Sequence, residues 1–271
     1  MTTSPQTGSL TPAEIEATFG DAPLASDAAG GLSSASSVKA EWARFGAFLK
    51  RPVLPHTPLP LSQAPKGTGR IFVLDLLVML VMIGTLVAVT SLGVELPENI
   101  NSTLEPGLAT FALVALAAPL GEELAFRSWL SGRPGHLLAI ALVIAGGLGA
   151  AIFSQIQPLA SAAIAIAGLV GAISAVIMLR GRPPMVWFVR AFPIFFWLST
   201  IGFALIHLLN YTEGTLIVTL VLVTPQFVLG AMLGYVRVHF GLMAAIGLHA
   251  AHNFTLFGLA ALAMLAGAPQ G

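Results

Sequence analysis

Residues 137–179 read LLAIALVIAGGLGAAIFSQIQPLASAAIAIAGLVGAISAVIML, a stretch of 43 residues that contains no charged side chain. A helix needs about 20 consecutive apolar residues to cross a bilayer, so this stretch is long enough for two crossings. We predict spans over 137–156 and 158–180, with a short uncharged turn between them. Such segments are typical of an integral membrane protein.

The rest of the chain has the same character. Of its 271 residues, 56% are hydrophobic and only 9% are charged, and the mean hydropathy is +0.89. Soluble domains carry about 25% charged residues, so most of this protein's surface must face something other than water. We therefore predict an all-α fold, a polytopic transmembrane helix bundle of about seven spans. The further spans are expected near 71–94, 107–131, 188–210, 215–237 and 241–266.

The composition also excludes several functions. The chain has no cysteine, which rules out disulfides, thiol catalysis and cysteine-bound metal centres. Its formal net charge of zero gives no electrostatic support to nucleic-acid binding, so no nucleic-acid partner is expected. The N-terminal residues lack a basic segment followed by an apolar core, and we expect no cleavable signal peptide.

The N-terminal part of the chain differs from the remainder in composition. Residues 1–38 are rich in Ser, Thr, Ala, Gly and Pro without apolar periodicity, which predicts a disordered tail. Residues 39–70 are predicted to form an interfacial amphipathic helix followed by a Pro-rich linker. In that helix Trp42, Phe45 and Leu49 share one face. A solvated basic segment is the alternative.

Basic residues fall on alternate loops between the predicted spans. Membrane proteins keep Lys and Arg on the cytoplasmic side, so this pattern predicts a cytoplasmic N-terminus. The excess of arginine over lysine, with abundant Ala and Gly, indicates a bacterial chain, and we expect it in the bacterial inner membrane. The basic residues assigned to the cytoplasmic side are Lys39, Arg44, Lys50, Arg51, Lys66, Arg70, Arg133, Arg180, Arg182, Arg190 and Arg237.

The predicted second span carries two adjacent glutamates and an arginine. Glu123 and Arg127 are four residues apart on one helical face, which is the spacing of an ion pair. Glu122 points about 100° away and is left for a different environment, where it can act as a general base toward water. The alternative is a buried Glu–Arg pair that only fixes helix packing. Pro119 is expected to kink the helix just before this motif.

Two further spans carry histidines. Phe203 and His207 are four residues apart, as are His249 and Asn253, so each pair shares a helical face. Histidine can transfer a proton near neutral pH or bind a metal, and an asparagine amide can donate to a developing oxyanion. A single histidine in a membrane helix more often serves packing. Two of them, together with Glu122 and Asn253, indicate a site.

Helix geometry also predicts depth. At 1.5 Å per residue, Glu122 and His249 lie about 13 and 12 Å from the cytoplasmic ends of their spans, whereas His207 lies about 21 Å in. We therefore expect a site that opens toward the cytoplasm, with His207 deeper than the other two. Asp75, near the start of the first span, is expected to be solvated at the interface. His252 is expected to bond to backbone or water, with a place in the site cavity as the alternative.

The three motifs together resemble the CPBP (or Abi) family of CAAX-processing intramembrane proteases, which includes the type II CAAX prenyl endopeptidase. They occur in the family's order, each on a predicted span, and the resemblance covers about half of the chain. The matching stretches are GEELAFRSWL at 121–130, STIGFALIHLLN at 199–210 and PQFVLGAMLGYVRVHFGLMAAIGLHAAHNF at 225–254.

The resemblance implies roles for the motif residues. Glu122 would activate water, and His207 and His249 would position the water or the substrate carbonyl. Asn253 would donate to the oxyanion. Residues expected to support the site are Glu123, Arg127 and Phe203, the last by shaping the pocket.

No obligatory cofactor is expected, because Glu122 could activate water without zinc. Zinc stays open as an alternative, because one glutamate and two histidines are an acceptable set of three ligands. Those ligands would be Glu122, His207 and His249.

The chain departs from the family in one respect. Glu122 and His207 are 85 residues apart, whereas the family usually separates these motifs by a few dozen residues. The two spans at 137–180 therefore read as a helix pair inserted into a transmembrane protease-like domain over 71–271. An even number of inserted spans preserves the orientation of everything that follows.

We accordingly predict an intramembrane endopeptidase that hydrolyses a peptide bond near the cytoplasmic membrane face. Its expected partners are membrane lipids and a peptide or membrane-protein substrate. The alternative is a non-catalytic assembly subunit or immunity protein that retains the protease fold and motifs, with a membrane-protein partner bound through the inserted helices or the N-terminal segment. Retention of the complete motif set favours activity, because polar side chains are costly at bilayer depth.

Overall fold

The computed structural model describes residues 35–55, 59–60, 62–104, 107–265 and 267. All of them belong to one compact unit, Ser34–Gly271. The secondary structure of these residues is helical, with no β-strand among them. This confirms the predicted all-α fold. The tail predicted over 1–38 lies almost entirely outside the described residues.

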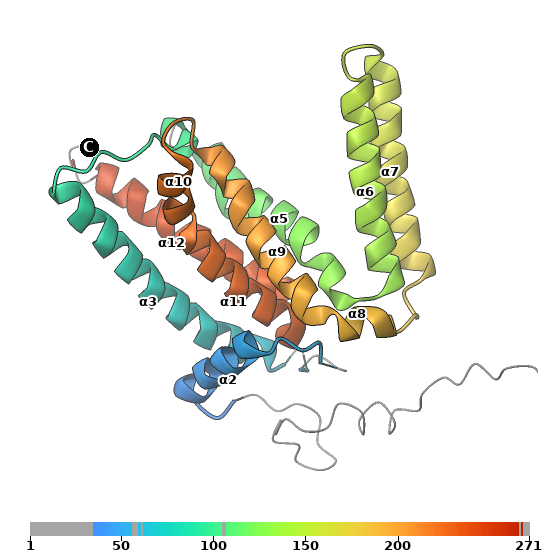
Figure 1. Ribbon diagram of the computed structural model, residues 1–271, viewed down its shortest axis with the longest axis horizontal. Helices are drawn as coiled ribbons and strands as arrows, with labels where there is room; N and C mark the ends of the chain where they lie inside the picture. The colour runs from blue at the N-terminus through green and yellow to red at the C-terminus, as the bar shows by residue number, and fades with distance from the viewer. Residues whose placement is uncertain (1–34, 56–58, 61, 105–106, 266, 268–271) are drawn as a thin grey trace, which may run out of the picture. The chain divides into compact units, whose positions relative to one another are not determined.

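Among the described residues, six helical segments are long and apolar enough to cross a membrane, and a bent helix pair makes a seventh if it counts as one span (Figure 1). The prediction of about seven spans is thereby confirmed, while their direction across the membrane stays a prediction. The spans are α3 (Ala64–Ser91), the segment Leu108–Phe126, α6 (Pro134–Phe153), α7 (Pro158–Met178), the segment Phe192–Asn210, the pair α10 (Leu216–Leu222) with α11 (Thr224–Phe240), and α12 (Leu242–Leu265). Shorter helices are α2 (Val38–Lys50), η1 (Ile100–Thr103) and α8 (Val186–Arg190).

Two spans are irregular next to a proline. The second span consists of α4 (Leu108–Ala112), the π-helical turn η2 (Leu113–Ala117) and α5 (Ala118–Phe126), with proline in the first turn of α5. Proline has no N–H to donate, so the regular hydrogen-bond ladder is interrupted there. The sixth span bends by 43° between α10 and α11, where α11 also begins with a proline. The span predicted over 215–237 corresponds to this bent pair of helices.

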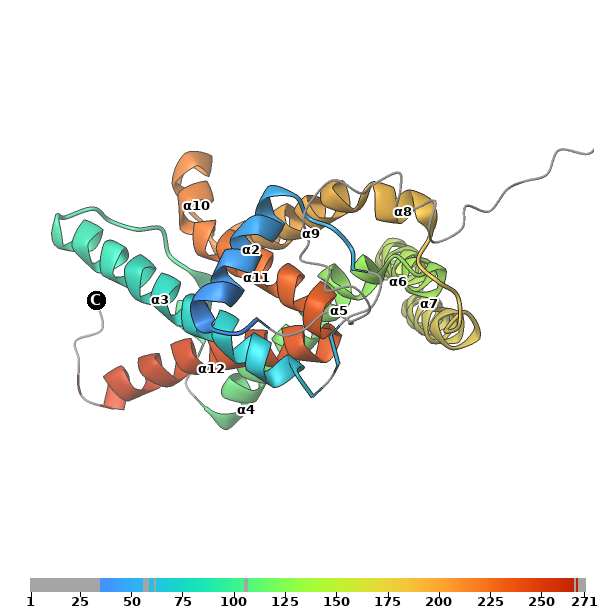
Figure 2. The same ribbon diagram turned by 90° about the horizontal axis from the view of Figure 1, so that it is seen from below.

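Helix α11 is the centre of the bundle. It contacts α2, α3, α9 (Phe192–Ile206) and α12, and nearly all of its second half is buried (Figures 1 and 2). Two glycines make this close packing feasible. A Cβ atom at Gly234 would lie 2.7 Å from Cε2 of Phe196, and one at Gly230 would lie 3.1 Å from Cδ1 of Phe203. Both aromatic rings belong to α9, so α9 and α11 meet at the glycines.

Substitution of Gly234 by alanine is expected to destabilise the protein by about 1–3 kcal/mol, because the added methyl group would displace the buried Phe196 ring. Unfolding of the detergent-solubilised protein would measure the change. The matched control is Gly247→Ala on α12, where an added Cβ meets nothing within 4 Å. Equal stability of the two variants would contradict the packing of α9 on α11.

The N-terminal helix α2 packs on the bundle (Figure 2). Phe45 and Phe48 are buried, and the centroid of each ring lies 5.3 Å from that of Tyr235 in α11. The Tyr235 hydroxyl donates to the fully buried carboxylate of Glu41 at 2.5 Å. The linker after α2 is shorter than expected, because α3 begins at Ala64, with proline in its first turn, rather than at residue 71. The contact of α2 with lipid stays a prediction.

Helices α6 and α7 form a hairpin beside the bundle (Figure 1). They pack closely on each other, since a Cβ atom at Gly146 would lie only 3.0 Å from Cα of Gly168. Most of their large apolar side chains are exposed, which suits a lipid environment. The hairpin joins the bundle at η3 (Ser128–Ser131), the short turn that follows α5.

Candidate active site

Helix α5 directs its two glutamates to different neighbours. Glu123 is fully buried, and its Oε1 accepts a 2.9 Å hydrogen bond from Nη1 of Arg127, which is also fully buried. The ion pair expected from the sequence is therefore present. The side chain of Glu122 is 30% exposed, and its buried Oε2 atom has no hydrogen-bond partner among the described residues. The two carboxylates thus have separate environments.

Phe203 connects the buried ion pair to both histidines. The Arg127 guanidinium lies 3.9 Å from the centroid of the Phe203 ring, which is a cation–π contact. The same ring makes edge contacts with His207 and His249, at centroid distances of 4.8 and 5.6 Å. Phe203 therefore contacts three polar side chains from the last turn of α9.

His207 and His249 approach Glu122 from two other helices. Nε2 of His207, in the turn η4 (His207–Asn210) at the end of α9, lies 3.9 Å from Oε2 of Glu122. Nε2 of His249, in α12, lies 3.8 Å from the same oxygen. Three segments that are distant in the sequence therefore converge on one carboxylate oxygen.

The other ring nitrogens fix the orientation of both imidazoles. Nδ1 of His207 lies 2.7 Å from the carbonyl oxygen of Phe203, and Nδ1 of His249 lies 3.0 Å from Oε1 of Glu123. Carbonyl and carboxylate oxygens only accept hydrogen bonds, so both Nδ1 atoms donate. In a neutral ring each Nε2 then carries a lone pair. Oε2 of Glu122 therefore lies near two further acceptor atoms, an arrangement that can bind a hydrogen-donating molecule such as water.

Asn253 lies one turn after His249 on α12. Its Nδ2 donates to the carbonyl oxygen of Val114 at 2.8 Å, inside the π-helical turn η2. A side-chain amide has two N–H groups, so one of them remains for another acceptor. Asn253 therefore links α12 to the irregular turn before Glu122. Its role as an oxyanion donor stays a prediction.

His207 reaches the site, although the sequence predicted that it lies deeper in the membrane than Glu122 and His249. Counting at 1.5 Å per residue placed it about 9 Å deeper than His249, yet the two rings approach Glu122 equally closely. The count assumed that all spans begin at one level and stand upright. Helix α9 follows the short helix α8 directly, and it need not begin at the membrane surface.

Asp75 and His252 form a second buried pair. Asp75 in α3 is 2% exposed and His252 in α12 is 9% exposed. Nδ1 of His252 lies 3.0 and 2.9 Å from the two carboxylate oxygens. The expectations of a solvated Asp75 and of a His252 bonded to backbone or water are therefore wrong. One signal was available, because Asp75 is the only acidic residue in the span predicted over 71–94.

Side chains from α9 and α11 donate hydrogen bonds to carbonyl groups at the end of α5. Oγ of Ser199 in α9 donates to the Phe126 carbonyl oxygen at 2.6 Å, and Nε of Arg237 in α11 donates to the Arg127 carbonyl oxygen at 2.9 Å. Carbonyl groups at a helix end lack partners within the helix, so these bonds satisfy them. From the sequence, Arg237 was expected only in a cytoplasmic loop, and its contact with the end of α5 was not predicted.

A zinc ion fits this arrangement poorly. The described residues contain no group of three His, Cys, Asp or Glu side chains arranged to hold a metal ion. Tetrahedral zinc ligands at about 2.0–2.1 Å from the metal lie roughly 3.4 Å from one another. Oε2 of Glu122 is 3.8 and 3.9 Å from the two histidine nitrogens, so the side chains would have to move to share one ion.

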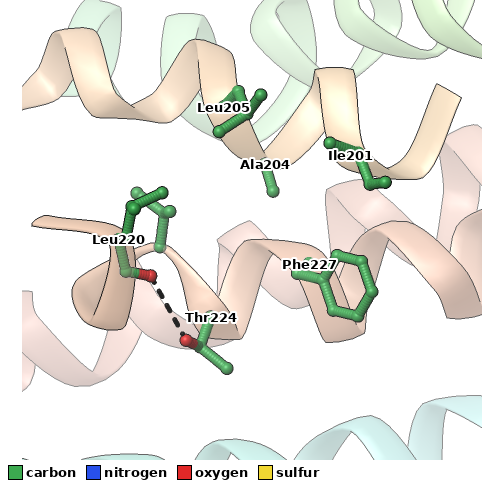
Figure 3. A pocket seen from close by; sticks show the side chains of 7 residues that line it. Ile201, Ala204, Leu205, Leu220, Thr224 and Phe227 are labelled. Atoms are coloured by element: carbon green, nitrogen blue, oxygen red, sulfur yellow. Dashed lines mark hydrogen bonds between the residues drawn. The ribbon is translucent and has the colours of Figure 1, made fainter. Parts of the chain in front are cut away.

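An apolar hollow lies apart from this cluster, between α9 and the bend of the sixth span (Figure 3). Its volume is about 230 Å³, and none of the predicted site residues lines it. Thr224 turns its hydroxyl toward the Leu220 carbonyl oxygen at 3.4 Å, which leaves an apolar lining suited to lipid. The lining residues are Ile201, Ala204, Leu205, Leu220, Val223, Thr224 and Phe227.

Comparison with known proteins adds one finding. Residues 178–255 match the family model described as type II CAAX prenyl endopeptidase Rce1-like. The match is consistent with the CPBP family of membrane proteases and supports a CAAX-type intramembrane protease fold, as the motifs indicated. It includes His207, His249 and Asn253. No curated protein and no solved structure matches the chain.

Proposed function

We propose that this CAAX-type membrane protein is an endopeptidase in which Glu122 activates water to hydrolyse a peptide bond. The observation that carries the proposal is the approach of two histidine Nε2 atoms to one carboxylate oxygen, at 3.8 and 3.9 Å. Each group comes from a different apolar helix. Such an arrangement is costly at bilayer depth and is typical of a functional site.

A water molecule can bridge these atoms. With hydrogen bonds of about 2.8 Å, one water oxygen reaches Oε2 of Glu122 and a histidine Nε2 at the same time. The water donates one hydrogen to each and directs a lone pair at the substrate carbonyl carbon. As the new C–O bond forms, the proton passes to Glu122, which then transfers it to the amine nitrogen when the C–N bond breaks.

The two histidines receive different roles in this proposal. Nδ1 of His207 donates to a neutral carbonyl group, which leaves Nε2 as an acceptor. We therefore assign His207 to accept a hydrogen bond from the water. His249, whose Nδ1 donates to the Glu123 carboxylate, is assigned in its protonated form to donate from Nε2 to the substrate carbonyl oxygen. The second N–H of Asn253 is assigned to the same oxyanion.

The proposed reaction requires no metal ion, since Glu122 itself takes the proton from water. We propose that it takes place near the cytoplasmic face of a bacterial inner membrane, on a peptide or membrane-protein substrate. The alternating basic loops support that orientation.

A cleavage assay in ¹⁸O-labelled water tests the proposal. The full chain in lipid nanodiscs would be incubated with a farnesylated C-terminal peptide, with the same peptide unmodified, and with a library of membrane-protein peptides. We expect new peptide termini, one ¹⁸O atom in the new carboxylate, and no loss of rate with EDTA. Intact peptides in the presence of folded protein would overturn the proposal. A membrane protein that co-purifies in fixed ratio would then favour the assembly-subunit alternative.

A further inference from the structure

The buried pair of Asp75 and His252 has no part in the reaction proposed above. The residues lie in the first and last spans, 177 positions apart, and both carboxylate oxygens are within 3.0 Å of the ring Nδ1. A carboxylate at this depth is costly unless it is paired. Thr85 and Ser91 of the same span, by contrast, bond to carbonyl groups of α3 itself.

Helix α12 makes three polar contacts with three different elements over five residues. His249 bonds to α5, Asn253 bonds to the turn η2, and His252 bonds to α3. At 100° per residue, His252 projects about 60° to one side of His249 and Asn253 about 40° to the other. The contacts that flank His249 therefore resist rotation of α12 in either direction.

Rotation of α12 would directly affect the distance between His249 and Glu122. The side chains of a helix lie about 5–6 Å from its axis, so a rotation of roughly 20° moves a side-chain tip by about 2 Å. A misplacement of about 1 Å can reduce a reaction rate about 100-fold. The 3.8 Å separation at the candidate site is therefore sensitive to the contacts beside it.

We infer that Asp75 and His252 are positioning residues for the candidate active site. Their pair fixes the rotation of α12 against α3 and so places Nε2 of His249 at Glu122. This inference rests on the endopeptidase function proposed above. The pair does not touch the reacting atoms in this scheme.

Kinetics of the full chain test the inference. Asp75→Ala and His252→Ala are expected to lower kcat about 10- to 100-fold per folded molecule, with KM changed less than twofold. Asp75→Asn keeps an oxygen that accepts from Nδ1 and is expected to retain most of the activity. The matched controls are Thr85→Ala on α3 and Thr255→Ala on α12, since each hydroxyl bonds only to its own helix. A purely structural pair would reduce the amount of folded protein and leave kcat per folded molecule unchanged.

A distance measurement separates this inference from the proposed function. The chain has no cysteine, so spin labels can be placed through Leu259→Cys on α12 and Leu198→Cys on α9, both exposed positions. Asp75→Ala is expected to shift or broaden the label distance distribution by about 2 Å, and Thr85→Ala to leave it unchanged. If Asp75→Ala shifts the label distances but the wild-type protein cleaves no peptide, the proposed function fails and the inference about α12 stands. An unchanged distribution with an unchanged kcat in folded Asp75→Ala would overturn the inference.

Discussion

Substitution of Glu122 by glutamine is expected to lower kcat by a factor of about 10²–10⁴, which is the usual contribution of a general base. Glutamine keeps the shape of the side chain, but its amide cannot take a proton from water. Because the interaction is needed only in the transition state, KM should change little. Steady-state cleavage of whichever peptide the wild-type protein hydrolyses would measure both constants.

Two further variants sharpen this experiment. Glu95→Gln removes an exposed glutamate from the segment that follows α3 and is expected to leave kcat unchanged. Glu122→Asp keeps the carboxylate but withdraws it by roughly the length of one C–C bond, so an intermediate kcat is expected. Full activity of folded Glu122→Gln would show that another group activates the water.

The sequence was sufficient for features that depend on local helical geometry. Four-residue spacing predicted the bond between Glu123 and Arg127, and the 100° offset correctly gave Glu122 a separate environment. The lengths of the apolar runs predicted the spans. In each case the signal and the structure belong to the same stretch of chain, so no knowledge of distant contacts was required.

Features that depend on contacts between distant segments could not be predicted from helical spacing, and only the meeting of Glu122, His207 and His249 was expected, through the family resemblance. The partners Asp75 and His252 are 177 positions apart, and nothing in either segment names the other as its partner. The packing of α2 on α11 through Tyr235 likewise depends on tertiary contacts. The bend of the sixth span could be predicted only in part, because Pro225 indicates a break in the helix but does not give its angle.

Substitution of Arg127 by methionine is expected to destabilise the protein by about 3–5 kcal/mol, the usual cost of leaving one charge of a buried pair without its partner. Glu123 would remain fully buried, with only His249 bonded to its carboxylate. The Phe203 ring would also lose the guanidinium that lies 3.9 Å from its centroid. Reversible unfolding in mixed micelles would measure the change in free energy.

A double-mutant cycle distinguishes the charge from the packing. Glu123→Gln combined with Arg127→Met removes both charges and retains most of the side-chain volume, so we expect it to be more stable than Arg127→Met alone. Arg133→Met is the control, because Arg133 is exposed and bonds only to a loop carbonyl group; its cost should stay below about 1 kcal/mol. If Arg127→Met costs no more than this control, the buried pair does not stabilise α5. The fixed placement of Glu122 would then have to come from Ser199 and Arg237, whose bonds hold the carbonyl groups at the end of that helix.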